Sequence, residues 1–496
     1  MGSGFNVFNS PDQGDISQNY DEFLTWWSPG QYLIPYFFKI ITGTNLSQGI
    51  AITVSICQVT GLAGFYFFFK KLGFDPLISS VSLLLIACQQ AFVVPYVYYN
   101  GGEILLFAFE GWFLYGCISI KKLDWLMVLF VVLSGWIGFF LKSSFLWIYA
   151  AGLVCLWLMA TAKKPKVWKW IKSGLWLVIH PMLTYFAFYF IWIRKGLKIA
   201  IPAILSVGVI YIAYISRGQS PITTSNGAKL TVQTFAFPLA SPVLSGFSID
   251  DLFHGLIYHT DEVILNPQWS IALLILTAVI SLFLVRAIIK YIPNKNYKLF
   301  ILVFYVVAIL FFSYSYFRQL NISMEARHFR ILGILITPGL VYLVSKLKLA
   351  FVLLFMLIPV LLTGFNIYYL AEGYNFNRNV AARGVTGIAQ PNIDQTSLNY
   401  LIKLDKANRN AVFVFISNDI GLEILHNRII TLPPIGNDLK ININDYKFEG
   451  HAGPLYIVLP ESYNGPKEKM IMKSFPAYKG FNVSMLSNDY VLYSAK

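Results

Sequence analysis

Long apolar segments constrain the fold of this sequence more than any other feature. Between residues 47 and 370 they follow one another with only short polar breaks. The hydrocarbon core of a bilayer is about 30 Å thick, so a helix of about 20 apolar residues crosses it. Within the bilayer each backbone N–H and C=O group needs a partner inside the protein, which a helix supplies within one segment. The sequence therefore predicts a polytopic α-helical membrane protein.

About eleven segments have the length and hydropathy of a transmembrane helix. They cover residues 47–69, 75–97, 101–120, 124–141, 143–161, 172–193, 197–215, 269–291, 298–317, 329–346 and 348–370. Hydrophobic residues make up 56% of the 496 residues and charged residues only 12%, whereas soluble domains carry about 25% charged residues. This composition excludes a wholly soluble globular protein and, because it is so apolar, intrinsic disorder.

The net charge of +14 indicates membrane topology rather than a nucleic-acid partner, and we expect no nucleic acid to bind. Lys and Arg collect in cytoplasmic loops of membrane proteins, and here they border apolar segments. The predicted cytoplasmic loops contain Lys70-Lys71, Lys121-Lys122, Lys163 to Lys172, Arg286 to Lys298 and Lys346-Lys348. Residues 1–46, 98–102, 216–268, 318–328 and everything after 371 are then extracytoplasmic.

One stretch conflicts with this topology. Three predicted spans, 172–193, 197–215 and 269–291, separate two basic loops that should lie on the same side. Three crossings cannot return a chain to the side from which it started. We therefore expect one of the first two to be re-entrant or interfacial, with a helix break at His180-Pro181.

The two ends of the chain differ from its middle. Residues 1–46 contain an acidic segment followed by an apolar, aromatic one at 31–41, which is too short to span and is typical of a helix lying at the membrane interface. Residues 376–496 alternate β-rich and helical patterns, which predicts a soluble extracytoplasmic α/β domain. The remaining residues, 47–375, form the transmembrane domain, with the loop 216–268 on its outer side.

The expected elements of the C-terminal domain are short. The predicted strands cover Ala411–Ile416, Arg428–Leu432, Leu455–Leu459, Asn482–Leu486 and Tyr490–Tyr493. The predicted helices cover Gln395–Asn408, Ile420–His426 and Lys467–Ser474. No glycine-rich phosphate loop and no metal-binding spacing of Cys or His occurs in this part of the sequence, so a binding or supporting role is favoured for it.

Four carboxylates precede the interfacial segment: Asp12, Asp15, Asp21 and Glu22. Carboxylates in an outer loop can act as a general base or bind a divalent cation. The alternative is a solvated acidic tail. The turn-forming sequence Trp26-Trp27-Ser28-Pro29-Gly30 that follows favours a fixed loop over a loose tail.

Two glutamates occupy one predicted helix. Glu103 stands at its start, where a carboxylate either interacts with the helix N-terminus or points into an outer cavity. Glu110 lies seven residues deeper in an apolar segment. Ionisable residues at that depth usually face a polar interior and serve function.

Cations also occur on the outer side, against the usual preference. Lys142 is the single cation between two apolar runs, so it either binds an anion such as phosphate or extends to the outer headgroups. The segment 325–330 carries Arg327 and His328 in a short outer loop, and the planar guanidinium suits phosphate recognition. His254, His259 and their acidic neighbours in the loop 216–268 match no metal-binding spacing.

Together these features resemble the GT-C superfamily of integral-membrane glycosyltransferases, which includes protein O-mannosyltransferases and the aminoarabinose and arabinofuranosyl transferases. The resemblance lies in an acidic first outer loop leading to Gly30 and Gln31-Tyr32-Leu33, and in an outward Lys within Phe140-Leu141-Lys142-Ser143-Ser144. It continues with Arg327 before a helix that contains Pro338, and with a soluble outer domain after the last span. Members normally carry a transmembrane helix before the acidic loop, and this sequence enters the loop at Met1-Gly2-Ser3-Gly4.

The resemblance implies transfer of a sugar from a polyprenyl-phosphate donor to a lipid, glycan or protein acceptor on the outer face of the membrane, usually with inversion. It assigns Asp12 or Asp15 as general base, with Asp21 and Glu22 as weaker candidates. Lys142 and Arg327, with His328 beside them, would contact the lipid phosphate, and Glu103 would support acceptor or metal binding. Some members need a divalent cation such as Mg²⁺ or Mn²⁺ and others do not. The range of the family points to a bacterial inner membrane.

Two other functions remain open at this point. An outer-leaflet polysaccharide polymerase or ligase would depend on Arg217, His254 and His259 in the large outer loop. A transporter or flippase would need a charged path across the membrane, for which Glu110 is the main candidate residue.

Overall fold

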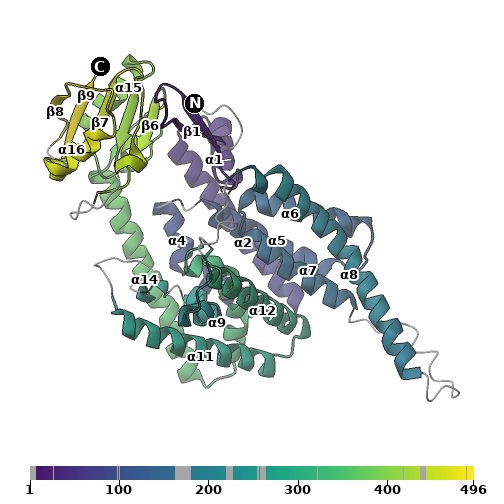
Figure 1. The fold of residues 1–496 in the computed structure, drawn as a ribbon. Coiled ribbons are helices and arrows are strands. Elements are labelled where there is room, and N and C mark those ends of the chain that lie inside the picture. The colour runs from purple at the N-terminus through teal and green to yellow at the C-terminus, as the bar shows by residue number, and fades with distance from the viewer. Residues whose placement is uncertain are drawn as a thin grey trace. The chain divides into compact units, whose positions relative to one another are not determined.

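The computed structural model consists of two units, each described here by itself (Figure 1). The α/β unit contains Met1–Leu24, Pro35–Ile52 and Ala371–Lys496, and the membrane unit contains Thr25–Ile34 and Thr53–Leu370. The structure describes residues 7–25, 27–97, 99, 101–161, 180–218, 227–247, 249–253, 256, 264–320, 322–416, 418–435, 443–487 and 489–496.

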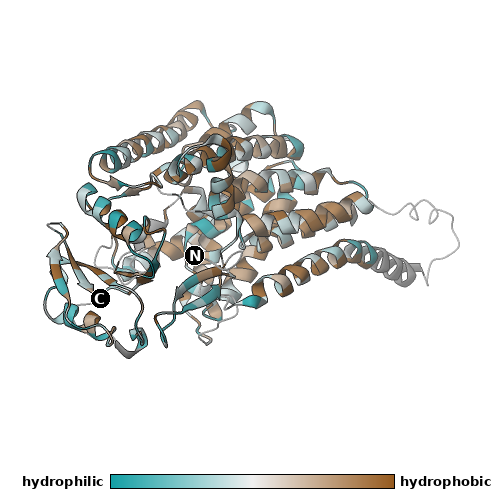
Figure 2. Cartoon of the chain, turned by 90° about the horizontal axis from the view of Figure 1, so that it is seen from above, coloured by the Kyte–Doolittle hydropathy of each residue, from teal (hydrophilic) through white to brown (hydrophobic). Residues whose placement is uncertain are grey.

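Helices make up the membrane unit, and in Figure 2 most of their residues are coloured as hydrophobic. In chain order the first helices are α1 (Gly30–Thr42), α2 (Leu46–Leu72), α3 (Pro76–Ala87), α4 (Gln90–Val97), α5 (Gly102–Ser119), α6 (Trp125–Leu141), α7 (Phe145–Thr161) and α8 (His180–Ala213). They are followed by η2 (Ile215–Arg217), α9 (Val232–Phe247), η3 (Asp250–Phe253), α11 (Pro267–Tyr291), α12 (Lys295–Phe317), η4 (Ala326–Phe329), α13 (Arg330–Val344) and α14 (Leu349–Asn379). Helices α1, α2 and α14 carry residues of both units.

The prediction of a polytopic helical membrane protein is supported, but the expected count of about eleven spans is not. The described residues contain seven helices that are long and apolar enough to cross a membrane, or eight if the bent pair α3–α4 forms one span. Helices α6 and α7 are apolar but have only 17 residues each. At 1.5 Å per residue each is about 25 Å long, shorter than a typical hydrocarbon core.

Helix α8 corrects the prediction for the conflicting stretch. It is continuous from His180 to Ala213, so the predicted segments 172–193 and 197–215 are not two helices where the structure describes them. His180-Pro181 begins the helix instead of breaking it, because proline is well tolerated in a first turn. The part that qualifies as a span is Trp192–Arg217. Among the described residues, the candidate spans between the two basic loops are this part of α8 and α11, a number compatible with the placement of both loops on one side.

The break between α3 and α4 shows how the membrane unit satisfies irregular backbone. The two helices meet at an angle of 44° around Cys88 and Gln89. The Asn366 side-chain amide of α14, which is buried, donates to the Cys88 carbonyl. The Gln89 side chain donates to the Gly246 carbonyl at 2.9 Å. The Asn366 side chain thus supplies a partner for backbone at the bend, and Gln89 links the bend to α9.

The C-terminal part of the α/β unit is built on a five-stranded mixed sheet in the order β6-β5-β7-β9-β8. Strand β5 is parallel to β6 and to β7, whereas β9 is antiparallel to β7 and to β8. The strands are β5 (Val412–Phe415), β6 (Arg428–Thr431), β7 (Leu455–Pro460), β8 (Asn482–Met485) and β9 (Tyr490–Ala495), with helices α15 (Gln395–Ala407) and α16 (Pro466–Lys473). All five predicted strands and two of the three predicted helices are confirmed.

The third predicted helix, Ile420–His426, is wrong. Only a short 3₁₀ helix, η5 (Asn418–Gly421), occurs there. The buried side chain of Asp405 accepts hydrogen bonds from the backbone N–H groups of Leu425 and His426. These donors are therefore used by a side chain and are not available for helical hydrogen bonds.

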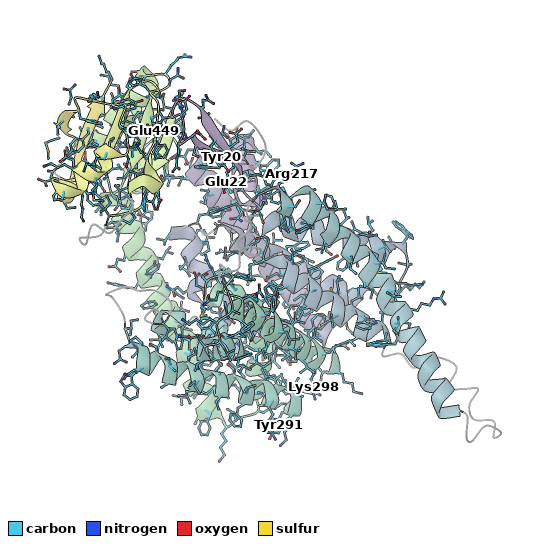
Figure 3. All side chains as sticks on the ribbon, in the orientation of Figure 1. Tyr20, Glu22, Arg217, Tyr291, Lys298 and Glu449 are labelled. Atoms are coloured by element: carbon cyan, nitrogen blue, oxygen red, sulfur yellow. The ribbon has the colours of Figure 1, made fainter. Side chains whose placement is uncertain are left out.

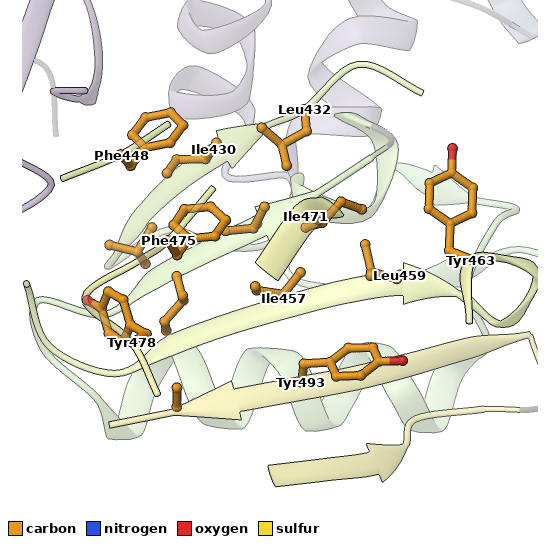
Figure 4. Close-up of a cluster of buried hydrophobic side chains, with 14 of the residues drawn as sticks. Ile430, Leu432, Phe448, Ile457, Leu459, Tyr463, Ile471, Phe475, Tyr478 and Tyr493 are labelled. Carbon is orange, nitrogen blue, oxygen red and sulfur yellow. The ribbon is translucent and has the colours of Figure 1, made fainter. Parts of the chain in front are cut away.

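Apolar side chains from one face of the sheet form a core with the following loops (Figure 4). Ile457 and Leu459 of β7 pack with Ile471 of α16 and with Phe475 in this cluster. Alternation of side chains along β7 places Tyr456 and Val458 on the opposite face, in a second cluster beneath α15. Burial on both faces accounts for the continuous apolar sequence of this central strand.

The acidic first segment is an ordered part of this unit and not a tail. Strands β1 (Val7–Pro11) and β2 (Asn19–Phe23) pair antiparallel, and Tyr20 and Glu22 lie on β2 (Figure 3). Ile16 in the connecting loop is fully buried in the core of the C-terminal sheet. Its carbonyl accepts a hydrogen bond of 2.6 Å from the Arg428 guanidinium. Gln13 adds hydrogen bonds to Glu449 and Asp445, so several contacts fix the loop that carries the acids.

Candidate functional site

A pocket in the membrane unit brings charged residues from three separate segments together. It encloses about 310 Å³ of space, counted to its opening. Helix α5, the α6–α7 turn with the start of α7, and the η4–α13 segment form its walls. The lining residues are Glu103, Leu106, Glu110, Lys142, Ser144, Ile148, Arg327, His328, Arg330 and Ile331.

Two glycines allow the start of α5 to approach its neighbours. Gly101 has a φ of +66°, in the left-handed region that favours glycine, and a Cβ there would lie 2.4 Å from Gln31 Oε1 of α1. A Cβ on Gly102 would lie 2.9 Å from both the Leu141 carbonyl oxygen and Lys142 Cβ. A side chain at Gly102 would therefore push α5 and the α6–α7 turn apart. The absence of one lets Glu103 lie close to Lys142.

Close approach at Gly102 places Glu103 beside Lys142. The Lys142 ammonium forms an ion pair with Glu103 Oε1. The side chains of Lys142 and Glu103 are 16% and 4% exposed. Lys142 adopts an extended backbone after the last residue of α6, and Ser144 of the same turn also lines the pocket. A buried pair of this kind is stable only as a pair, because either charge alone would be costly to bury.

The third wall adds two arginines and a histidine. Arg327 Nε lies 2.5 Å from Glu325 Oε2 and 3.9 Å from Glu103 Oε1, and its side chain is 42% exposed. Arg330 begins α13 and also lines the pocket. His328 Nε2 lies 3.1 Å from Ser323 Oγ. Arg327 and Arg330 are three residues apart in a helical turn, so both face the same wall.

Glu110 lies at the deeper part of the same pocket. The residue is 4% exposed, and it faces the pocket from the second turn after Glu103. Among the residues that the structure describes, its carboxyl group forms no hydrogen bond and no ion pair. The charges of Arg330 and Lys142 act on it electrostatically. Its environment is thus positive but leaves the carboxylate oxygens available to a ligand.

The first-loop acids belong to the α/β unit, and their side chains make local hydrogen bonds. Asp12 Oδ1 accepts from the N–H groups of Gly14 and Asp15. The Asp15 carboxylate accepts from the hydroxyl and N–H of Ser17 and from the Gln18 amide. The bonds from Ser17 hold the pKa of Asp15 below its usual value, because they stabilise the charged form.

The charged residues of the pocket do not fit a divalent cation. No group of three or more His, Cys, Asp or Glu side chains with suitable geometry occurs in the described part of the chain. In the pocket Glu103 is paired with Lys142, and two arginines lie on the facing wall. Carboxylate and carbonyl oxygens are what Mg²⁺ or Mn²⁺ would need. The reaction proposed below therefore assigns no step to a metal ion.

Four of the residues selected from the sequence meet in this pocket: Glu103, Lys142, Arg327 and His328. Glu110 joins them, as its position deep in an apolar helix indicates. Arg330 and Ser144 were not selected, although the spacing of Arg327 and Arg330 could have identified the first of them. His254 and His259 of the outer loop lie outside the described residues.

Comparison with known proteins gives one structural likeness. No protein-family model and no curated protein sequence matches the chain. The chain is similar to the cryo-EM structure of the arabinofuranosyltransferase AftD from Mycobacteria, with a TM-score of 0.44 and 9% sequence identity. The match covers 99% of this chain and 36% of that one, so the chain spans about a third of its length. We therefore argue function from the pocket itself.

Proposed function

We propose that this protein is a membrane glycosyltransferase that transfers a sugar from a polyprenyl-phosphate donor to an acceptor hydroxyl at the extracytoplasmic face, with inversion. The observation that carries the proposal is the cluster of Lys142, Arg327 and Arg330 around one pocket in an apolar helical unit. Cationic side chains are rare in such units and mark binding sites when they face a cavity.

The chemistry requires a site for developing negative charge. As the bond between the anomeric carbon and the phosphate oxygen breaks, the lipid phosphate gains a second negative charge. Lys142 offers a compact ammonium, and the arginines offer planar forks that suit phosphate oxygens. Donors held in place before the reaction stabilise that charge without further reorganisation. The donor's long lipid tail explains why such a site would be built into a membrane unit.

The acceptor hydroxyl must lose a proton as its oxygen attacks the anomeric carbon. The resemblance assigns this general base to Asp12 or Asp15, and the assignment stays a prediction. Of the two, Asp12 is the better candidate, because its Oδ2 forms no hydrogen bond among the described residues, whereas both oxygens of Asp15 accept. Asp12→Asn should abolish transfer while membrane insertion stays unchanged; full activity in both Asp12→Asn and Asp15→Asn would remove these residues as the base.

The expected partners follow from this reaction. They are a polyprenyl-phosphate-linked sugar, a lipid, glycan or protein acceptor, and the bilayer. A bacterial inner membrane with the C-terminal α/β domain on the extracytoplasmic side is the location that we propose.

A transfer assay with a matched lysine variant tests the function. Membranes containing the full chain are supplied with polyprenyl phosphates that carry radiolabelled mannose, arabinofuranose or aminoarabinose, and label in the acceptor fraction is counted. The wild-type chain should transfer at least one of these sugars and Lys142→Met should not. Lys71→Met is the control, because Lys71 lies at the end of α2, near the Tyr115 ring and away from the pocket. Equal transfer by wild-type protein and Lys142→Met would refute the proposal.

A further inference from the structure

We infer that Glu110 accepts a hydrogen bond from a hydroxyl group of the donor's sugar, so that the pocket binds phosphate at one end and the sugar at the other. This inference rests on the proposed function and adds a specificity-determining residue to it. It follows from the positions of two carboxylates on one helix and from the different partners that they have.

Glu103 and Glu110 lie on the same face of α5. Seven residues correspond to almost two full turns and to a rise of about 10 Å, and both residues, with Leu106 between them, line the pocket. A phosphate joined to a single sugar ring has a similar length. The spacing therefore suits a headgroup whose phosphate lies near Lys142 and whose ring extends toward Glu110.

The two carboxylates differ in their availability. Glu103 is neutralised by the Lys142 ammonium and lies near Arg327. Glu110 is equally buried but has no hydrogen-bonding or ion-pairing partner in the described part of the structure. Buried polar groups without partners are uncommon in folded proteins. One that faces a cavity is satisfied when a ligand supplies the missing donor.

The surroundings of Glu110 determine which kind of chemical group can form a hydrogen bond with it. A second cation is disfavoured, because Arg330 and Lys142 already act on this carboxyl group. A carboxyl group accepts hydrogen bonds in either protonation state. A neutral O–H group is therefore the partner that suits this position. Leu106, Ile148 and Ile331 supply the apolar surface against which the C–H groups of a sugar ring can pack.

Binding measurements with two kinds of ligand test this role. The full chain in lipid nanodiscs is titrated with farnesyl phosphate and with farnesyl phosphates that carry mannose or arabinofuranose. In the wild-type protein at least one glycoside should bind about tenfold more tightly than farnesyl phosphate, as one additional hydrogen bond permits. Glu110→Gln should remove most of that difference and leave the affinity for farnesyl phosphate unchanged.

Three further variants separate the possible roles. Glu110→Asp keeps the carboxyl group and should retain part of the sugar-dependent difference, which a mere packing role would not explain. Trp112→Phe, on the same helix but outside the pocket, should behave as wild type. Lys142→Met should weaken the binding of every ligand, and unchanged binding of farnesyl phosphate to Lys142→Met would count against the proposed function itself.

The inference fails separately if the wild-type protein shows no sugar-dependent difference. It also fails if Glu110→Gln leaves that difference intact, or weakens farnesyl phosphate binding as much as glycoside binding.

Discussion

The membrane unit and the α/β unit both bury carboxylates, but they surround them differently. In the membrane unit Glu103 faces a lysine and Glu110 faces an open pocket. In the α/β unit Asp405 and Glu423 are almost fully buried and are surrounded by hydrogen-bond donors of their own chain. The four side chains have similar exposure, so burial alone does not separate functional from structural acids.

The α/β carboxylates are saturated by their surroundings. Asp405 accepts from the N–H groups of Leu425 and His426, from His426 Nδ1 at 2.7 Å and from the Asn427 amide. Glu423 accepts from the N–H groups of Val385 and Thr386 and from the Thr386 hydroxyl. Gly384 makes room for this contact, because a Cβ there would lie 2.2 Å from the Glu423 carboxyl carbon. Such acids hold loops together and have no capacity left for a ligand.

The partners of a buried charged side chain therefore indicate whether its role is structural or functional. A carboxylate saturated by backbone donors fixes a loop, and its loss reduces stability. A carboxylate or ammonium that faces a cavity with unfilled bonding capacity is arranged for a ligand, and its loss reduces binding or catalysis.

Loss of the pocket lysine should have the largest effect. Lys142→Met removes the ammonium that would stabilise the leaving phosphate and leaves Glu103 buried without its partner. Removal of one such donor lowers turnover by about 10²–10³-fold in other enzymes. The loss is measured as the rate of sugar transfer from a polyprenyl-phosphate donor, with Lys71→Met as the control. A fall in sugar transfer of less than about threefold would show that Lys142 has a structural role and does not act in the reaction.

Substitution of Arg330 should cause the second-largest loss of sugar transfer. The planar shape of its guanidinium should matter as well as its charge. Arg330→Lys keeps the charge but loses the planar fork, so we expect about a tenfold loss of transfer, near the lower limit for a charge-stabilising donor. Arg330→Gln should lose more. The same assay decides the point. Identical activity in Arg330→Lys and Arg330→Gln would show that neither charge nor fork at this position is used.

Glu423→Gln should leave transfer unchanged and destabilise the α/β unit. The variant turns one acceptor oxygen into an N–H donor that faces other donors, which costs about 1–3 kcal/mol of unfolding free energy. Hydrogen exchange of residues 384–388 in the full chain should become faster. Glu449→Gln is the control, because the Glu449 side chain is 51% exposed and its carboxylate forms an ion pair with Lys447 (Figure 3). Equal exchange in both variants would contradict the structural role of Glu423.

Loss of the Asp405 carboxylate should have the smallest effect, a reduction in stability that depends on pH. Burial alone would raise the pKa of Asp405, but the hydrogen bonds from His426 and Asn427 outweigh it and hold the pKa below its usual value. Because the folded-state pKa is the lower one, the stabilisation is complete above the unfolded-state pKa of about 3.9. It is lost as pH falls through the folded-state pKa.

Thermal unfolding of the full chain in nanodiscs measures this dependence. Asp405→Asn should lower the unfolding temperature at pH 7, and the difference from wild type should shrink toward pH 3 and below. A difference that stays constant over this pH range would show that the charge of Asp405 is not what holds the loop.

Much of the architecture could be read from the sequence, because hydropathy and strand patterns are local. Apolar runs of about 20 residues identified α2, α5, α11, α12, α13 and α14, and β-branched and aromatic runs identified all five strands of the C-terminal sheet. The failures also have physical causes. Helix α8 continues through the polar sequence from Arg194 to Gly196. Hydropathy cannot distinguish such a polar helical turn from a loop.

The sequence by itself thus determined that this chain enters a membrane. It also indicated that four charged residues in or beside apolar segments serve a function: Glu103, Glu110, Lys142 and Arg327. Only the tertiary structure decided which of them meet. Glu103 and Lys142 are 39 residues apart, and they pair because Gly102 lets α5 approach the α6–α7 turn. The burial of Ile16 in a sheet formed more than 390 residues later is of the same kind. Such contacts depend on packing between distant segments, which no local pattern in the sequence encodes.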